Sequence, residues 1–287
     1  MATAKVAEIV TERIIAALEK GNIPWKKTWS TNLPKNLVSK KDYRGMNVFI
    51  LAACSSDEYF VTYKQAAALG GNVKKGEKGI PVIFWNFVEH ENKETGKKKT
   101  VPFMRYYTVF GLSQCENLKA PEKTVKQNNP IENCEKVIAN MPNKPNMKDG
   151  SNASYQPVTD TVTMPQINAF QNAESYYATL FHEEIHATGH NSRLNREGVA
   201  EHAAAFGSAT YSKEELVAEL GSAFLCAETG ISSDNLIENS VAYVQSWIKA
   251  LKNDAQFIIS ASSKARKAAE YILNKKDETA TTTETAE

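Results

Sequence analysis

The sequence predicts an α+β protein of two domains, an N-terminal α+β domain with a long β-hairpin and a C-terminal domain that is mostly helical. The length of 287 residues favours two domains over one. β-rich runs at residues 80–88 and 103–112 enclose a polar segment that contains Thr95-Gly96, which is the pattern of a long hairpin. After residue 131, apolar residues recur at helical spacing through most of the chain.

The expected domain limits follow from a polar segment in the middle of the chain. Residues 121–130 are polar and contain Pro121 and Pro130, which indicates a linker between domains at 1–120 and 131–274. The tail 275–287 is rich in Thr and Glu and has no apolar periodicity. We expect this tail to be disordered.

Apolar spacing, glycines and capping residues delimit the individual elements. In the first domain, Gly21 stops an amphipathic helix at 4–20, and shorter helices are expected at 46–54 and 62–69. In the second domain, we expect a helix that begins near Asn172 or Ser175 and ends at Gly189. Short strands are expected before it, at 153–156 and 161–164. Further helices are expected at 131–141, 212–228, 241–252 and 254–274.

The net charge of +1 hides an asymmetry between the two parts. Residues 1–120 carry 19 Lys and Arg against 11 Asp and Glu, whereas the remainder carries 15 against 22. The first part also holds 14 of the 26 aromatic residues. A basic, aromatic-rich module beside an acidic one indicates that only the first meets polyanions.

The cysteines and the hydropathy indicate a cytoplasmic protein. The four cysteines are far apart and form no C-x-x-C pair, which is typical of reduced core residues. No apolar run approaches the roughly 18 residues that would span a bilayer, and the N-terminus lacks the apolar core of a signal peptide. We therefore expect no membrane partner.

Residues His182-Glu183-Glu184-Ile185-His186 form an H-E-x-x-H motif within an apolar, helix-forming run. Two histidines four residues apart lie on one face of a helix, where both can bind one metal ion. The intervening Glu183 then faces the water that the ion holds, as the general base of a zinc peptidase does. The simpler alternative is a surface helix with charged pairs at i and i+4.

A zinc site of this kind needs a third protein ligand. Many zincins take it from a Glu on the next helix, which here is Glu215, with Glu219 one turn later as the carboxylate that orients a ligand. Glu219 and His190 are the alternative ligands, and Ser212-x-x-Glu215 is also a capping box, which would need Glu215 only for the helix end. Two imidazoles and a carboxylate favour Zn²⁺ over manganese or nickel.

The basic part has the residue types that bind single-stranded DNA without sequence preference. Such binding needs cations along the phosphate backbone and flat side chains on which bases stack. Each residue also has a simpler explanation, since aromatic residues in strands are often core and lysine runs are often solvated turns. The candidates are Lys40, Lys41, Tyr43, Arg44, Lys64, Lys74, Lys75, Lys78, Arg105 and Tyr106.

Ordered motifs along the chain carry a family resemblance. In the first part they are Tyr43-Arg44-Gly45-Met46-Asn47, Thr62-Tyr63-Lys64-Gln65-Ala66, Val73-Lys74-Lys75-Gly76-Glu77-Lys78-Gly79 and Arg105-Tyr106-Tyr107-Thr108-Val109-Phe110. This part resembles the N-terminal single-stranded-DNA-binding domain of ArdC-type antirestriction proteins. The second part resembles the zincin-like metallopeptidase domain paired with it, through the segments 176–183 and 214–221.

The resemblance implies single-stranded DNA binding and protection of incoming mobile DNA, such as a transferring plasmid, from restriction. It leaves three readings of the second domain open. In the first, a zinc peptidase acts on a host protein. In the second, the metal is structural and the protein only coats DNA. In the third, the chain is a peptidase whose basic domain binds an acidic protein.

Overall fold

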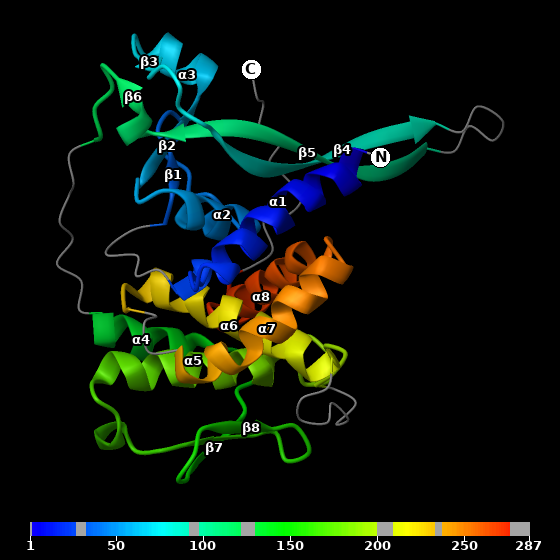
Figure 1. Cartoon of the computed structure of the whole chain (residues 1–287). Helices are drawn as coiled ribbons and strands as arrows, with labels where there is room; N and C mark the ends of the chain where they lie inside the picture. Colours follow the sequence, from blue (N-terminus) through cyan, green and yellow to red (C-terminus); the bar gives the residue numbers. More distant parts are fainter. Residues whose placement is uncertain are drawn as a thin grey trace.

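The computed structural model describes residues 2–26, 33–91, 98–121, 130–199, 209–232 and 237–275. The chain folds in layers (Figure 1): a sheet at one end, then helices α1 (Ala2–Glu19) and α2 (Met46–Cys54), then the C-terminal helices, and a small sheet at the far end. This arrangement confirms the predicted α+β class with a mostly helical C-terminal part.

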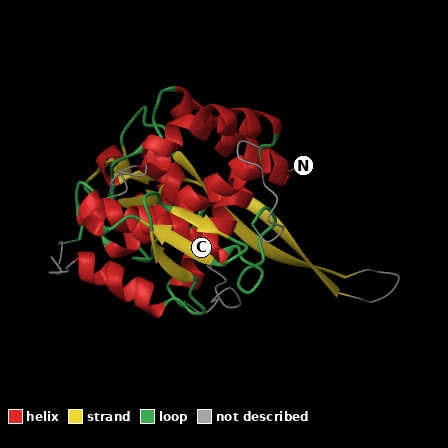
Figure 2. Ribbon diagram, turned by 90° about the horizontal axis from the view of Figure 1, so that it is seen from below, coloured by secondary structure: helices red, strands yellow, loops and turns green. Residues whose placement is uncertain are grey.

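The N-terminal sheet has the strand order β1-β2-β5-β4, with β1 parallel to β2 and the other pairs antiparallel. The register of β4 and β5 runs from Ile80↔Val109 to Glu91↔Lys98, so the predicted hairpin is confirmed. The strands extend further outward than the β-rich runs, because backbone pairing does not require apolar side chains. Figure 2 shows this hairpin projecting from the body as an arm. The four strands are Lys35–Asn36, Tyr59–Thr62, Ile80–Glu91 and Lys98–Gly111.

Helix α2 lies between this sheet and the C-terminal helices, and most of its residues are buried. Asn47 fixes it to β4 by two hydrogen bonds with the backbone of Ile83, at 2.7 and 2.6 Å. The next helix, α3 (Tyr63–Ala68), begins with a capping box between Thr62 and Gln65. The remaining short elements of this part are η1 (Pro24–Lys26), η2 (Leu112–Gln114) and the paired strands β3 (Asn72–Val73) and β6 (Cys115–Glu116).

The C-terminal part is built on α5 and α6, which pack against each other, with α8 against α6. The Asn172 side chain caps α5 by accepting a 2.8 Å hydrogen bond from the Ser175 backbone, so Asn172 is the cap. All predicted helices of this part are present. They are α4 (Pro130–Asn140), α5 (Ala173–Thr188), α6 (Ala209–Thr229), α7 (Ile237–Asn253) and α8 (Phe257–Ile272).

The small sheet has the order β7-β9-β8 and includes a strand that the sequence did not predict. That strand is β7 (Asn146–Asp149), whose four residues are all exposed, so it has no alternation of apolar and polar positions to mark it. The two predicted strands are present as β8 (Ser154–Gln156) and β9 (Thr161–Met164), and η3 (Ile167–Ala169) follows them.

The N-terminal and C-terminal parts share one hydrophobic core. The rings of Trp25 and Trp247 meet edge to face at 5.6 Å, and those of Phe49 and Phe224 lie 4.7 Å apart. The Thr11 hydroxyl donates a 2.7 Å hydrogen bond to the Ala255 carbonyl. The two parts are therefore held together by buried contacts and not only by the segment between them. The proposed limits at 121–130 and 275 stay predictions, because residues 122–129 and 276–287 lie outside the described chain.

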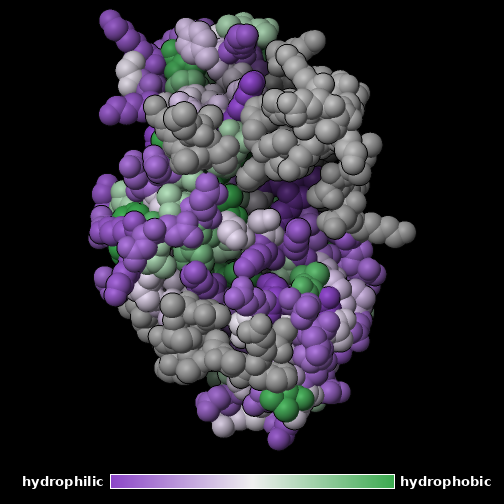
Figure 3. Space-filling view, turned by 90° about the vertical axis from the view of Figure 1, so that its right-hand side faces the viewer, coloured by the Kyte–Doolittle hydropathy of each residue, from purple (hydrophilic) through white to green (hydrophobic). Residues whose placement is uncertain are grey.

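No described helix is both long and apolar enough to cross a bilayer. The face seen in Figure 3 is largely hydrophilic, with hydrophobic residues in small patches.

Candidate metal centre

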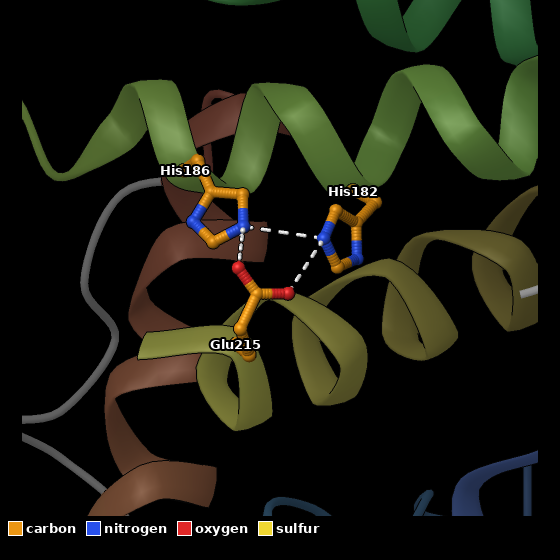
Figure 4. Close-up of side chains that lie close together, drawn as sticks. All are labelled: His182, His186 and Glu215. Atoms are coloured by element: carbon orange, nitrogen blue, oxygen red, sulfur yellow. Dashed lines mark hydrogen bonds and ion pairs between the residues drawn. The ribbon is translucent and has the colours of Figure 1, made fainter. Parts of the chain in front are cut away.

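Helices α5 and α6 bring three side chains to one point (Figure 4). His182 and His186 project from the same face of α5, and their Nε2 atoms lie 3.2 Å apart. Glu215 of α6 faces both of them. Its Oε2 lies 3.5 Å from His182 Nε2, and its Oε1 lies 3.4 Å from His186 Nε2.

These spacings fit a tetrahedral metal site. Zinc bonds of 2.0–2.1 Å at tetrahedral angles place neighbouring ligand atoms about 3.3 Å apart, close to the three measured separations. Among the residues that the structure describes, this is the one group of His, Cys, Asp and Glu with such spacing. The three side chains are only 8–14% exposed. Two imidazole nitrogens and a carboxylate are a donor set that suits a divalent transition metal.

The electrostatics of the group favour a bound cation. Burial lowers the pKa of His186, but its contacts with Glu214 and Glu215 outweigh that effect and raise the pKa to about 10. Burial raises the pKa of Glu215, but hydrogen bonds with His182 and His186 outweigh it and lower the pKa. Without a metal ion, a proton on His186 supplies the positive charge that Glu214 and Glu215 attract. A metal ion bound at the centre would supply that positive charge instead of the proton.

Glu214 supports His186 from the side away from Glu215. Its Oε1 lies 3.4 Å from His186 Nδ1 and accepts a 2.5 Å hydrogen bond from Arg196 Nη2. Arg196 Nε donates to Glu214 Oε2 at 3.2 Å, and the same guanidinium donates to the Thr188 hydroxyl at 2.6 Å and to the Ile185 carbonyl at 2.7 Å. Glu214 thereby orients the His186 ring, whereas the bonds from Arg196 to Thr188 and Ile185 fix the last turn of α5.

Glu214 and Arg196 were not predicted from the sequence as parts of this centre. From the sequence, Glu214 could simply have been solvated, but its side chain is only 9% exposed. One signal was available, since adjacent residues on a helix differ by about 100° in direction, so Glu214 and Glu215 can contact different sides of one imidazole. The position of Arg196 depends on the turns after Gly189, which no periodicity describes.

The other predicted residues of the centre have different places. Glu219 is buried, and its charge raises the pKa of His182, but it is not part of the close group. His190 lies past the end of α5, where its Nδ1 is 2.8 Å from the Ser192 hydroxyl. The capping box at Ser212 is wrong, because α6 begins at Ala209 and the Ser212 hydroxyl contacts that of Ser246 at 2.6 Å.

The two glutamates inside the motif have different environments. Glu183 is 9% exposed, and its charge raises the pKa of His182. Glu184 is 1% exposed, and none of the described residues offers its Oε2 a hydrogen-bond partner. Burial raises the pKa of Glu184 to about 8, against the opposing charges of Lys144 and Arg193. Of the two glutamates, Glu183 is the one whose charge acts on His182 of the centre.

The predicted DNA-binding residues lie in several separate segments of the N-terminal domain, between residues 40 and 106. All are exposed except Tyr43, which is half-buried against Phe60. Lys40 lies over the Tyr59 ring at 5.7 Å, and Lys74 donates to the Ser113 carbonyl at 2.8 Å. The others are Lys41, Arg44, Lys64, Lys75, Lys78, Arg105 and Tyr106. Tyr63 is a further candidate that was not predicted. At 63% exposure it is the most exposed aromatic residue among those that the structure describes, and it adjoins Lys64.

Comparison with known proteins assigns a class to each part. Residues 4–110 match the model of the N-terminal domain of the anti-restriction factor ArdC, and residues 132–264 match that of a zincin-like metallopeptidase. The antirestriction protein ArdC of plasmid R388 has a metal-free crystal structure that is 36% identical in sequence, with a TM-score of 0.76. The match covers 94% of this chain and 97% of that one. An Mn(II)-bound structure of ArdC matches over the same shares, at 34% identity and a TM-score of 0.75.

Three curated relatives extend the comparison. Two DNA primases TraC of Escherichia coli are each 37% identical over 93% of this chain, which spans 20% and 27% of their lengths. An uncharacterised protein y4eC of Sinorhizobium fredii is 35% identical and is covered over 91% of its length. The fold and the matches thus define a two-domain protein with an ArdC N-terminal domain and a zincin-like domain. The chain belongs to the ArdC family of antirestriction proteins.

Proposed function

We propose that this protein binds single-stranded DNA through its N-terminal domain and hydrolyses a peptide bond at His182, His186 and Glu215, with Zn²⁺ as the metal and Glu183 as general base. The observation that carries the proposal is the spacing of these three side chains, with Glu183 next to His182 on the same helix. The domains proposed for these roles are residues 1–120 and 131–274, joined by the linker 121–130.

A bound divalent ion would polarise the peptide carbonyl and lower the pKa of its water. Glu183 would be the base that accepts a proton from the attacking water and delivers it to the leaving amine. His186 keeps Nε2 directed at the centre because Glu214 lies at its Nδ1. Glu219 contributes negative charge that acts on His182.

The choice of zinc rests on the donor set and on the tetrahedral spacing. The related ArdC of R388 has been crystallised with Mn(II), so manganese is the competing ion. Loading each ion into metal-free protein and comparing affinities would decide between them.

The DNA-binding role is supported by the exposed cations and aromatic residues of the N-terminal domain and by the antirestriction family itself. A strand that enters a new host would be coated by this domain, while the second domain acts on a host protein. The four cysteines are free, which fits a reducing compartment, and we place the protein in the cytoplasm.

The second candidate is a DNA-binding protein with a structural metal site. It is favoured by the position of the centre between α5 and α6, the two helices on which the C-terminal part is built. In this version the ion stabilises the fold and Glu183 has no substrate.

One experiment separates the two candidates. Metal content, cleavage of a peptide library and affinity for a single-stranded oligonucleotide are measured for wild type, Glu183→Gln and His186→Ala. Peptidase action predicts that Glu183→Gln keeps metal and DNA binding but loses cleavage, and that His186→Ala loses metal as well. Cleavage that persists in Glu183→Gln would reject the general-base role. Wild-type protein that binds metal and DNA but cleaves nothing would favour the second candidate.

A further inference from the structure

A cavity of about 490 Å³ opens between the two domains, away from the metal centre. One wall is the segment from Leu33 to Val48, and the other is made by the C-terminal ends of α6 and α8. Its volume lies within the range of about 300–1,000 Å³ that is usual for small-molecule sites, and such sites favour domain interfaces. None of the catalytic roles proposed above uses this cavity.

The apolar part of the lining suits a flat ring. Val48, Phe224 and Leu273 contribute aliphatic and aromatic surface from both domains, and Tyr43 lines the same space. Tyr43 is held by its backbone hydrogen bond of 2.7 Å to the Pro34 carbonyl and by edge-to-face contact with Phe60. A planar ligand would therefore meet side chains whose positions are already fixed.

The charged part of the lining is largely neutralised internally. Lys275 pairs with Glu228 at 2.8 Å, and Arg266 pairs with Glu270 at 2.7 Å. Two charges are left to a ligand. Arg44 is exposed and makes no hydrogen bond or ion pair within the part of the chain that the structure describes. Within the described residues, Asp42 has a loose ion pair, with its Oδ1 3.8 Å from Lys35 Nζ.

A nucleotide has the groups that this lining recognises. The phosphate matches the Arg44 guanidinium, the ring matches the apolar walls, and an exocyclic amino group matches an accepting carboxylate, as when Asp or Glu accepts from cytosine N4. The segment that leads to Arg44 is basic, because it contains Lys35, Lys40 and Lys41. A polyanionic strand is thus favoured over a neutral planar metabolite.

We infer that this interdomain cavity takes one unstacked nucleotide of a bound single strand and prefers a base with an exocyclic amino group, through Asp42. The inference rests on the proposed DNA binding and extends it, since it makes the DNA touch both domains. Phosphate contacts elsewhere on the N-terminal domain give affinity without regard to sequence, whereas this cavity gives a base preference.

The test compares oligodeoxycytidine with oligodeoxyuridine, each about 12 nucleotides long, by fluorescence anisotropy on the full chain. The two rings differ at position 4, where cytosine carries the amino group and uracil a carbonyl, and at N3, which carries a hydrogen only in uracil. Wild type is expected to bind the cytidine strand about tenfold more tightly, the effect of one hydrogen bond to a charged group. Asp42→Ala is expected to bind both strands equally.

Two further variants complete the design. Glu8→Gln removes an exposed carboxylate of α1 that does not line the cavity, so it is expected to keep the tenfold preference. Arg44→Ala is expected to weaken both strands while the preference remains. Thermal melts of all variants verify that the protein is folded.

The outcomes separate the inference from the proposed function. Equal binding of the two strands by wild type, or a preference that survives in Asp42→Ala, would overturn the nucleotide site and leave DNA binding in place. Absence of binding to either strand would overturn both. A preference that disappears in Asp42→Ala and persists in Glu8→Gln would support the site.

Discussion

Glu214→Gln is expected to weaken metal binding although Glu214 is not one of the three ligands. In the wild type its carboxylate lies 3.4 Å from His186 Nδ1 and holds the ring with Nε2 toward Glu215. Loss of such an outer carboxylate typically costs about 10- to 100-fold in metal affinity, or about 1.4–2.8 kcal/mol. A competitive titration with a fluorescent zinc chelator measures this change directly.

The same substitution also affects folding, because Arg196 is buried and loses its counterion. Breaking a buried ion pair costs about 3–5 kcal/mol, and we expect about 3 kcal/mol because the Gln carbonyl still accepts one hydrogen bond. For a chain of this size that is a fall of about 6 °C in melting temperature, measured with excess chelator so that metal binding does not contribute.

A matched control separates the two effects. Thr188→Val removes the 2.6 Å hydrogen bond from Arg196 Nη1 but leaves Glu214 beside His186. It should lower the melting temperature slightly and keep zinc affinity unchanged. Zinc affinity in Glu214→Gln equal to that of the wild type would refute the role of Glu214 in orienting His186.

Three more predictions concern pH, salt and the shared core. The pKa of His186 in the folded protein is raised to about 10 from 6.5, so protonated His186 stabilises the metal-free protein fully below pH 6.5, and this effect is lost as pH rises through about 10. The melting temperature of the metal-free protein should therefore fall across that window. A melting temperature that does not change with pH would contradict the coupling of His186 with the carboxylates. Replacing Lys74, Lys75 and Lys78 with Ala should reduce the slope of log affinity for single-stranded DNA against log salt by about 2, or about 0.7 per phosphate contact. A variant with exposed lysines of α8 replaced serves as the control. A slope equal to that of the wild type would show that Lys74, Lys75 and Lys78 do not contact phosphate. Trp247→Ala should cost about 3–5 kcal/mol of stability. In a chemical denaturation monitored separately in each domain, it should lower the midpoint denaturant concentration of both domains. A shift confined to the C-terminal domain would mean that the domains unfold independently.

The regular elements could be predicted because their signals are local. Met46–Cys54 is a helix with the predicted bounds, since its apolar residues and Gly45 delimit it. The Asn172 cap and the hairpin likewise depend on residues close together in sequence. Strand β7 could not be found, because pairing with β9 defines it and its side chains show no pattern.

Tertiary contacts were predictable only where a motif encodes them. The H-E-x-x-H spacing placed His182 and His186 on one face, and the position of Glu215 on the following helix came from knowledge of zincins. The bond from Arg196 to Glu214 and the contact of Trp25 with Trp247 join segments that no periodicity relates. Only the folded chain shows them.

The core shared by the two domains has a consequence for how this unit is inherited. A recombination event that cut the chain between the domains would leave Trp25 and Phe49 on one piece and Trp247 and Phe224 on the other, each with apolar surface open to water. The two halves are therefore expected to move between genes as a single block. The TraC primases fit this expectation, because they match 93% of this chain while it makes up less than a third of their length.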